Sequence, residues 1–131
     1  MNKPLILLVE DEADFREILT AKLTAGGFDV QSAGDGVEGL EKLKTIKPDL
    51  VILDFMMPKM NGLETFMKMK EDAELKKLKV VFMTNHGEPL LELGDSDKKY
   101  AQEIGAMDFI RKTDDLNLAV AHLKELCGIN Q

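Results

Sequence analysis

The sequence contains a single cysteine, two histidines and no tryptophan among its 131 residues. One cysteine cannot form a disulfide within the chain, so the composition favours a reducing compartment, and we expect a cytoplasmic protein. The histidines and the cysteine form no cluster along the sequence, which argues against a zinc site. The sequence therefore offers neither a disulfide framework nor a zinc cluster.

Basic charge and long apolar stretches are also scarce. The 17 lysines and arginines are outnumbered by 24 aspartates and glutamates, so the formal net charge is -7 and the pI is about 4.8. This balance argues against direct nucleic-acid binding, which needs clustered basic residues. The apolar run before Glu10 is only five residues long, too short for a signal peptide or a membrane span. We expect a single domain over residues 1–131 that does not enter the membrane.

Apolar runs and helical spacing alternate along the chain. Strands are predicted at residues 5–9, 28–33, 50–53, 80–83 and 107–111. The run from Leu50 to Leu53 is apolar throughout, as in a strand buried on both faces. Because helical periodicity follows each strand, the pattern predicts an α/β fold with a doubly wound parallel sheet and right-handed crossovers. The pattern alone does not predict the strand order.

The helices are expected to turn an apolar stripe toward this sheet. Asp35 is a candidate cap for the second helix, and Pro48 is expected to close it. The expected inward-facing positions are Phe15, Ile18, Leu19 and Leu23; Val37, Leu40, Leu43 and Ile46; Leu63, Phe66 and Met67; Tyr100, Ala101 and Ile104 in a helix from about Ser96 to Ile104; and Leu116, Ala119, Val120, Leu123 and Cys127.

Polar residues stand at the carboxyl ends of four predicted strands. Glu10 and Asp11 follow the first strand, Asp54 the third, Thr84 the fourth and Lys112 the fifth. In a parallel sheet these ends lie along one edge, where the side chains can converge. Two carboxylates in contact repel by about 4 kcal/mol at an effective dielectric constant of about 20, so the acids need compensation. Mg²⁺, which prefers oxygen ligands, is the predicted cofactor.

Lys112 and Thr84 complete a set of groups suited to phosphoryl chemistry. A carboxylate nucleophile, a metal, a cation and a hydroxyl donor are what phosphoryl transfer to an acid requires. Each residue also has a simpler interpretation. Asp54 alone is explained as the cap of the following turn, and Glu10 to Glu12 as acids that favour a helix N-terminus. The placement of all these groups after matching strands favours the site.

The same residues resemble the receiver domain of two-component response regulators. The resemblance covers almost the whole chain and rests on Val9–Glu12, Leu53–Gly62, Thr84, Gly105-Ala106, Phe109 and Lys112. It implies a flavodoxin-like fold of five βα units with strand order 2-1-3-4-5. That order would place Asp11 and Asp54 on neighbouring strands.

The resemblance implies a phosphoacceptor and a metal site. Asp54 would take a phosphoryl group from a histidine kinase or a phosphotransfer protein. Asp11, Asp54 and the backbone carbonyl of Met56 would ligate Mg²⁺ directly. Glu10 would hold the ion through water.

The resemblance also implies a switch. Lys112 and Thr84 would bind phosphoryl oxygens, and Thr84 and Phe109 would move after phosphorylation and change the affinity for a partner. That partner would be an unknown output protein or an effector domain outside this chain. The domain would not be an enzyme, beyond slow self-dephosphorylation.

Three features depart from the usual receiver pattern. Thr113 stands after Lys112, where most receivers have proline. Asn85 replaces a small residue that often follows the threonine. The stretch between Thr84 and Gly105 is long, so an insertion is expected around His86 to Asp95.

Two other functions compete with the phospho-accepting switch. A Mg²⁺-dependent phosphohydrolase of the haloacid-dehalogenase type would carry a general acid two residues after its nucleophile, and that position is Met56 here. A receiver-like binding module without phosphorylation would be expected to lose one of the acids or the lysine, and none is lost.

Overall fold

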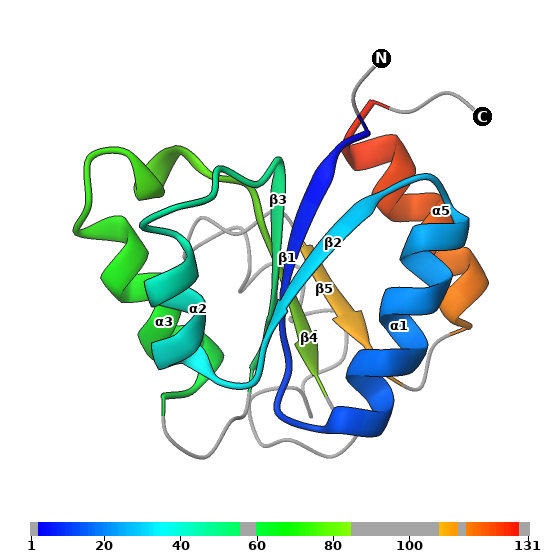
Figure 1. The fold of residues 1–131 in the computed structure, drawn as a ribbon, viewed down its shortest axis with the longest axis horizontal. Helices are drawn as coiled ribbons and strands as arrows, with labels where there is room; N and C mark the ends of the chain where they lie inside the picture. The colour runs from blue at the N-terminus through cyan, green and yellow to red at the C-terminus, as the bar shows by residue number, and fades with distance from the viewer. Residues whose placement is uncertain (1–2, 56–59, 85–107, 113–114, 129–131) are drawn as a thin grey trace.

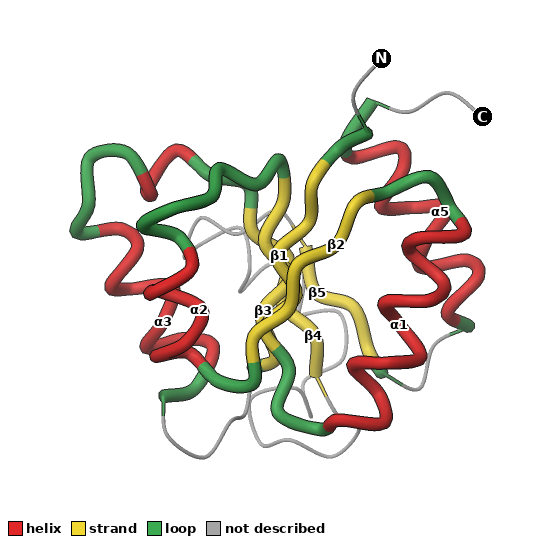
Figure 2. The backbone as a smooth tube through the Cα atoms, viewed as in Figure 1, coloured by secondary structure: helices red, strands yellow, loops and turns green. Residues whose placement is uncertain are grey.

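The structure is a computed structural model that describes residues 3–55, 60–84, 108–112 and 115–128 (Figures 1 and 2). Within these residues, five parallel strands form one sheet in the order β2-β1-β3-β4-β5. The strands are β1 (Leu5–Val9), β2 (Asp29–Ala33), β3 (Leu50–Asp54), β4 (Val80–Thr84) and β5 (Asp108–Arg111). The predicted parallel sheet and the strand order implied by the resemblance are both confirmed.

Helices cover both faces of this sheet. Helices α1 (Ala13–Ala25) and α5 (Leu116–Leu126) lie on one face, and α2 (Gly36–Lys42) and α3 (Gly62–Lys70) lie on the other (Figure 1). A short 3-10 helix, η1 (Leu75–Lys77), precedes β4. The doubly wound arrangement is therefore confirmed. Among the residues described, none of the helices combines the length and the apolar character needed to span a membrane.

Each face of the sheet supports its own core. Successive strand residues point to opposite sides, so Leu7 and Val9 pack in the cluster that contains Phe66 of α3. Ile6 and Leu8 pack in the other cluster, with Leu19 of α1 and Leu123 of α5. All five residues of β3 are buried, which confirms the doubly buried central strand predicted from its apolar run. Asp54 is the last residue of that strand.

Three apolar side chains expected to face the core are instead about half exposed. Ile18 in α1 is 51% exposed, Val37 in α2 48% and Met67 in α3 50%. One residue corresponds to about 100° of rotation in a helix, so a neighbour of a fully buried residue can fall outside the buried stripe. Leu19 and Phe66 lie at the centre of the buried stripes of their helices. Ile18 directly precedes Leu19, and Met67 directly follows Phe66.

Helix α2 is shorter than its apolar spacing predicted. It ends at Lys42, so Leu43 is its C-cap and Ile46 lies beyond it, and Pro48 does not close it. The next residues form turns in which Lys44 and Thr45 donate backbone hydrogen bonds three residues back. Ile46 still packs against the core, because the turn returns it to the sheet. The predicted cap is confirmed, since Asp35 Oδ1 accepts a hydrogen bond of 2.8 Å from Glu38 N.

Several expectations fall on residues outside those that the structure describes. These are the helix from about Ser96 to Ile104, the insertion around His86 to Asp95, and the positions of Asn85, Met56 and Thr113.

Gly62 lies where α3 begins against the end of β3. A β-carbon at this position would lie 2.4 Å from the carbonyl oxygen of Asp54 and 2.9 Å from Phe55 Cα. Both contacts are with backbone, which cannot turn aside as a side chain can. Gly62→Ala is therefore expected to lower the free energy of unfolding by about 1 to 3 kcal/mol, measured by urea denaturation.

Gly34→Ala is the matched control for that substitution. A β-carbon at Gly34 would make only ordinary contacts, at 3.5 Å from Glu38 Oε1 and 3.6 Å from Arg16 Nη1. Its effect on the urea midpoint is expected to be small. Equal losses for the two variants would contradict the packing argument at Gly62.

Candidate functional site

The carboxyl ends of the strands lie along one edge of the sheet, the lower edge in Figure 1. The parallel registers pair Val9 with Leu53, Asp54 with Met83, and Thr84 with Arg111. The residues that end or follow neighbouring strands are therefore brought to the same level. The sequence-based expectation of a convergent edge is met for Glu10, Asp11, Asp54 and Lys112.

Three of the predicted site residues are described only in part or not at all. Thr84 is the last residue of β4, and Phe109 lies in β5, but the structure describes the backbone of these two and not their side chains. Met56 lies outside the described residues. Their predicted roles stay predictions.

The three acids form a compact cluster. Glu10, Asp11 and Asp54 each offer a carboxylate oxygen, and these oxygens lie within 4.8 Å of one another. Glu10 is 0% exposed and Asp54 1% exposed, whereas Asp11 faces solvent. A buried pair with one solvent-facing acid provides oxygen ligands and an open side for water. This donor set fits a hard divalent cation such as Mg²⁺, and it does not fit zinc, which favours nitrogen and sulfur.

Three hydrogen bonds hold Glu10 at the edge of the sheet. Its backbone N donates to Ala33 O at 3.0 Å, and its carbonyl accepts a hydrogen bond of 2.7 Å from Arg16 Nη1. Its side chain accepts from the backbone N of Glu12 through Oε2, at 2.8 Å. The chain that leaves β1 is thus fixed by neighbours on β2 and α1, and the acids are placed before any ligand binds.

Lys112 inserts its ammonium group among the carboxylates. Lys112 Nζ lies 2.6 Å from Glu10 Oε1, 2.9 Å from Glu12 Oε1 and 3.1 Å from Asp54 Oδ2, and its side chain is only 5% exposed. The contacts with Glu12 and Asp54 are hydrogen bonds. The contact with Glu10 is an ion pair whose geometry is not that of a hydrogen bond, so buried Glu10 Oε1 accepts no hydrogen bond within the described residues. Glu10 Oε1 is therefore held by charge and not by a directed hydrogen bond.

The site holds more carboxylates than cations, and this imbalance shifts the pKa values of its groups. Burial raises the pKa of Asp54 to about 9, hydrogen bonding with Asp11 and the charge of Glu10 act in the same direction, and Lys112 opposes them. Burial alone would lower the pKa of Lys112, but its carboxylate partners outweigh burial and raise it. Burial would also raise the pKa of Asp11, but hydrogen bonds with Asp54 and Glu10 outweigh that and lower it. Asp54 therefore keeps its proton at neutral pH unless a second cation joins Lys112.

The helices that follow these acids are not capped by their side chains. Helix α3 is capped by Asn61, whose Oδ1 accepts from Glu64 N at 2.8 Å while Glu64 Oε1 accepts from Asn61 N at 3.2 Å. Asp54 is therefore not the cap of the helix that follows it. The Asn-x-x-Glu spacing was a signal for this capping box that sequence reasoning missed. Glu12 is the N-cap residue of α1, yet its side chain makes no cap hydrogen bond and pairs with Lys112 instead.

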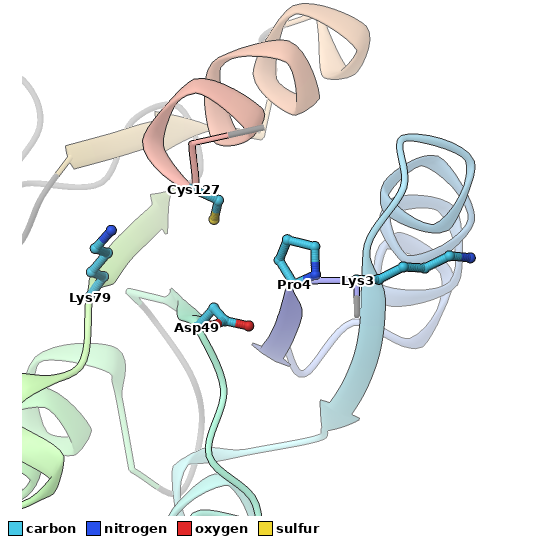
Figure 3. Close-up of a pocket in the computed structure, with 5 residues that line it drawn as sticks. All are labelled: Lys3, Pro4, Asp49, Lys79 and Cys127. Atoms are coloured by element: carbon cyan, nitrogen blue, oxygen red, sulfur yellow. The ribbon is translucent and has the colours of Figure 1, made fainter. Parts of the chain in front are cut away.

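A hollow lies at the opposite edge of the sheet, where the strands begin (Figure 3). It is lined by Lys3, Pro4, Asp49, Lys79 and Cys127. The Asp49 carboxylate accepts from Leu5 N at 2.7 Å, and Lys79 Nζ donates to Leu126 O at 3.4 Å, so both polar groups serve the local structure. Burial raises the pKa of the Cys127 thiol. This hollow lacks the cluster of acids found at the other edge.

Comparison with models of known protein families shows which family this chain belongs to. The model of the response regulator receiver domain matches residues 6–124. This chain belongs to the response regulator receiver domain family. Membership confirms the resemblance inferred from the strand-end residues and links the chain to two-component signal transduction. Receiver domains are in general not enzymes.

Two of the curated relatives of this receiver domain are named as transcriptional regulators. It is 36% identical over 121 residues to the transcriptional regulatory protein CpxR homolog of Haemophilus influenzae, covering 92% of this chain and 49% of that protein. It is 37% identical over 116 residues to the alkaline phosphatase synthesis transcriptional regulatory protein PhoP of Bacillus subtilis, covering 86% of this chain and 43% of that protein. The chain thus spans about half the length of these relatives, or less.

Solved receiver structures share the fold. A putative response regulator from Chloroflexus aurantiacus superposes with a TM-score of 0.83 at 24% identity, covering 97% of this chain and 99% of that one. The receiver domain of a signal transduction histidine kinase from Syntrophus aciditrophicus gives 0.81 at 29% identity, covering 95% and 90%. The flavodoxin-like fold is therefore confirmed.

Proposed function

We propose that this receiver domain is a phospho-accepting switch with Asp54 as its phosphoacceptor. The observation that carries the proposal is the position of Asp54 at the end of the central strand, with Lys112 Nζ 3.1 Å from its carboxylate and two further acids within 4.8 Å. Among the described residues, Asp54 is the only carboxylate that is itself the last residue of a strand, whereas Glu10, the other buried acid beside Lys112, follows β1.

The donor is a phosphohistidine on a histidine kinase or a phosphotransfer protein. An oxygen of the ionised Asp54 carboxylate attacks phosphorus, a P–O bond forms, and the P–N bond to the imidazole breaks. The imidazole nitrogen keeps the electron pair and takes up a proton. The product is an aspartyl phosphate, and the domain itself turns over no further substrate apart from slow self-dephosphorylation.

Glu10, Asp11 and Asp54 would hold Mg²⁺, together with the backbone carbonyl of Met56. The ion supplies the positive charge that lets Asp54 ionise and that neutralises oxygens of the phosphoryl group. Glu10 Oε1, which is buried and accepts no hydrogen bond from the described residues, supports a role for Glu10 in holding the ion or a water bound to it.

Lys112 and Thr84 would bind phosphoryl oxygens. Lys112 already hydrogen-bonds one carboxylate oxygen of Asp54, so a short movement of its ammonium would reach a phosphoryl group on this residue. Thr84 ends β4, the strand next to β3, which places its backbone at the same edge. Thr84 and Phe109 would then shift together and change the affinity of the domain for its partner.

The partner of the switch is an output protein or an effector domain outside residues 1–131. The matching relatives named as transcriptional regulators are about twice the length of the matched region or more, which favours an effector domain in addition to the receiver. Residues 1–131 would act as one receiver domain in the cytoplasm. The acidic net charge of -7 favours protein contacts over direct nucleic-acid binding by the domain.

Intact-protein mass spectrometry after incubation with acetyl phosphate tests this function. With Mg²⁺ the parent is expected to gain one phosphoryl group, and without Mg²⁺ little or none. Asp54→Asn is expected to abolish the gain, because an amide oxygen does not act as the nucleophile. A gain retained in Asp54→Asn would place the acceptor elsewhere.

The same experiment separates the competing functions. No gain in the parent, either from acetyl phosphate or from a purified phosphohistidine donor, would favour a binding module without phosphorylation. Continuous release of inorganic phosphate, with many turnovers per protein, would favour a phosphohydrolase.

A further inference from the structure

The three carboxylates around Lys112 differ in their access to solvent. The side chains of Glu10 and Asp54 are each 1% exposed, whereas that of Glu12 is 57% exposed. Glu12 Oε1 nevertheless accepts a hydrogen bond of 2.9 Å from Lys112 Nζ. The ammonium group is therefore bound on its buried side by the proposed site and on its solvent side by Glu12.

Hydrogen bonds with neighbouring residues hold the backbone of Glu12 in place. Its backbone N donates to Glu10 Oε2 at 2.8 Å, and its carbonyl accepts from Arg16 N at 2.9 Å. The side chain makes no cap hydrogen bond to its own helix, so its carboxylate is available to Lys112. The Phe15 ring, whose centre is 5.1 Å from Lys112 Nζ, lies beside the same ammonium.

A cation bound by the acid cluster would affect two of the three carboxylates that pair with Lys112, but not the third. Glu10 and Asp54 belong to the group of acids whose oxygens lie within 4.8 Å of one another, and Glu12 does not. A cation in that group would weaken the attraction between Lys112 and the two buried carboxylates. The pair between Lys112 and Glu12 would remain when the phosphoryl donor arrives.

We propose that Glu12 is a positioning residue that holds the Lys112 ammonium on the solvent side of the site and competes with phosphoryl oxygens for it. An ammonium has three N–H donors, so each carboxylate that it keeps leaves one fewer donor for a phosphoryl oxygen. Glu12 thus slows phosphoryl acceptance. This inference rests on the proposed function of Asp54.

Glu12→Gln tests the competition, with the initial rate of phosphoryl gain from acetyl phosphate at saturating Mg²⁺ as the readout. The rate is expected to rise about two- to fivefold, the factor that corresponds to losing a solvent-exposed ion pair. Glu12→Asp keeps the charge but shortens the side chain by one methylene, so it is expected to resemble Glu12→Gln. An unchanged or lower rate in Glu12→Gln would overturn the proposal.

Asp14→Asn is the matched control. Asp14 is an exposed acid in the first turn of the same helix, two residues away, and none of the ion pairs found among the described residues joins it to Lys112. The substitution removes the same charge and is expected to leave the rate unchanged. An equal acceleration in Asp14→Asn would show that the general negative field repels the donor, and the competition would be rejected.

A double-mutant cycle tests the pair without phosphorylation. Glu12→Gln is expected to change the urea midpoint in the parent at saturating Mg²⁺ but not in a Lys112→Met background. The same change in both backgrounds would mean that the pair does not persist beside the cation, which overturns the inference.

The two readouts distinguish the inference from the function on which it rests. If the parent accepts no phosphoryl group, the proposed function fails and the competition fails with it, while a measured coupling would show a purely structural pair. If the parent accepts the group and Glu12→Gln is not faster, only the inference fails.

Discussion

Lys112→Met is expected to lower the free energy of unfolding by about 3 kcal/mol at neutral pH, because it leaves the buried Glu10 carboxylate without its cation. Lys112 Nζ is the ion-pair partner of Glu10 and Asp54, and neither acid reaches solvent. Methionine fills a similar volume, so the loss reports charge rather than a cavity. Urea denaturation in the presence of a chelator measures it.

Mg²⁺ provides the internal check on this result. The ion binds the folded acid cluster and not the unfolded chain, so millimolar Mg²⁺ is expected to raise the Tm of the parent and to restore part of the stability of Lys112→Met. Absence of any shift in both proteins would contradict the assignment of the cluster as a cation site. Lys44→Met is the control, because the pair between Lys44 and Glu41 is largely exposed and is expected to contribute little.

Asp54→Asn is expected to stabilise the metal-free protein at pH 8. The pKa of Asp54 is raised from 3.8 to about 9 in the folded state, so between these values the folded protein binds a proton that the unfolded chain has released. The free energy of unfolding of the parent therefore falls as the pH rises through this window. Asparagine does not titrate, and it also removes one of the carboxylates that compete for Lys112.

The pH profile distinguishes this cause from a simple packing change. The parent and Asp54→Asn are expected to be nearly equal in stability at about pH 4 and to diverge steadily toward pH 9 in a chelator-containing buffer. Asp14→Asn, on the exposed side of α1, is expected to follow the parent's profile. A large loss of stability in Asp54→Asn at all pH values would instead make Asp54 a structural residue.

The local pattern of apolar and polar residues was sufficient to predict the strands and the acids at their ends. The apolar run from Leu50 to Leu53 predicted a strand buried on both faces, and that strand is the centre of the sheet. Because parallel strands end at one edge, Glu10, Asp11, Asp54 and Lys112 could be expected to meet, and the structure brings them together. This part of the site depends only on strand direction and on which residue follows each strand.

Residue periodicity was less reliable for the helices. The spacing of Val37, Leu40, Leu43 and Ile46 predicted a helix through residue 46, but α2 ends at Lys42. Ile18 and Met67 have the apolar character of core residues and are half exposed. A helix's buried stripe is set by where it packs on the sheet, which a local window of sequence does not contain.

The sequence alone determined the fold class, the set of strand-end groups and the need for a cation among the acids. The tertiary structure decided which of three consecutive acids does what: Glu10 is buried, Asp11 faces solvent beside Asp54, and Glu12 turns back to Lys112. Residues 10 and 112 are far apart in sequence, and their contact depends on how β1, β3 and β5 are ordered across the sheet. Strand order is a long-range property of packing, so neighbouring residues do not reveal it.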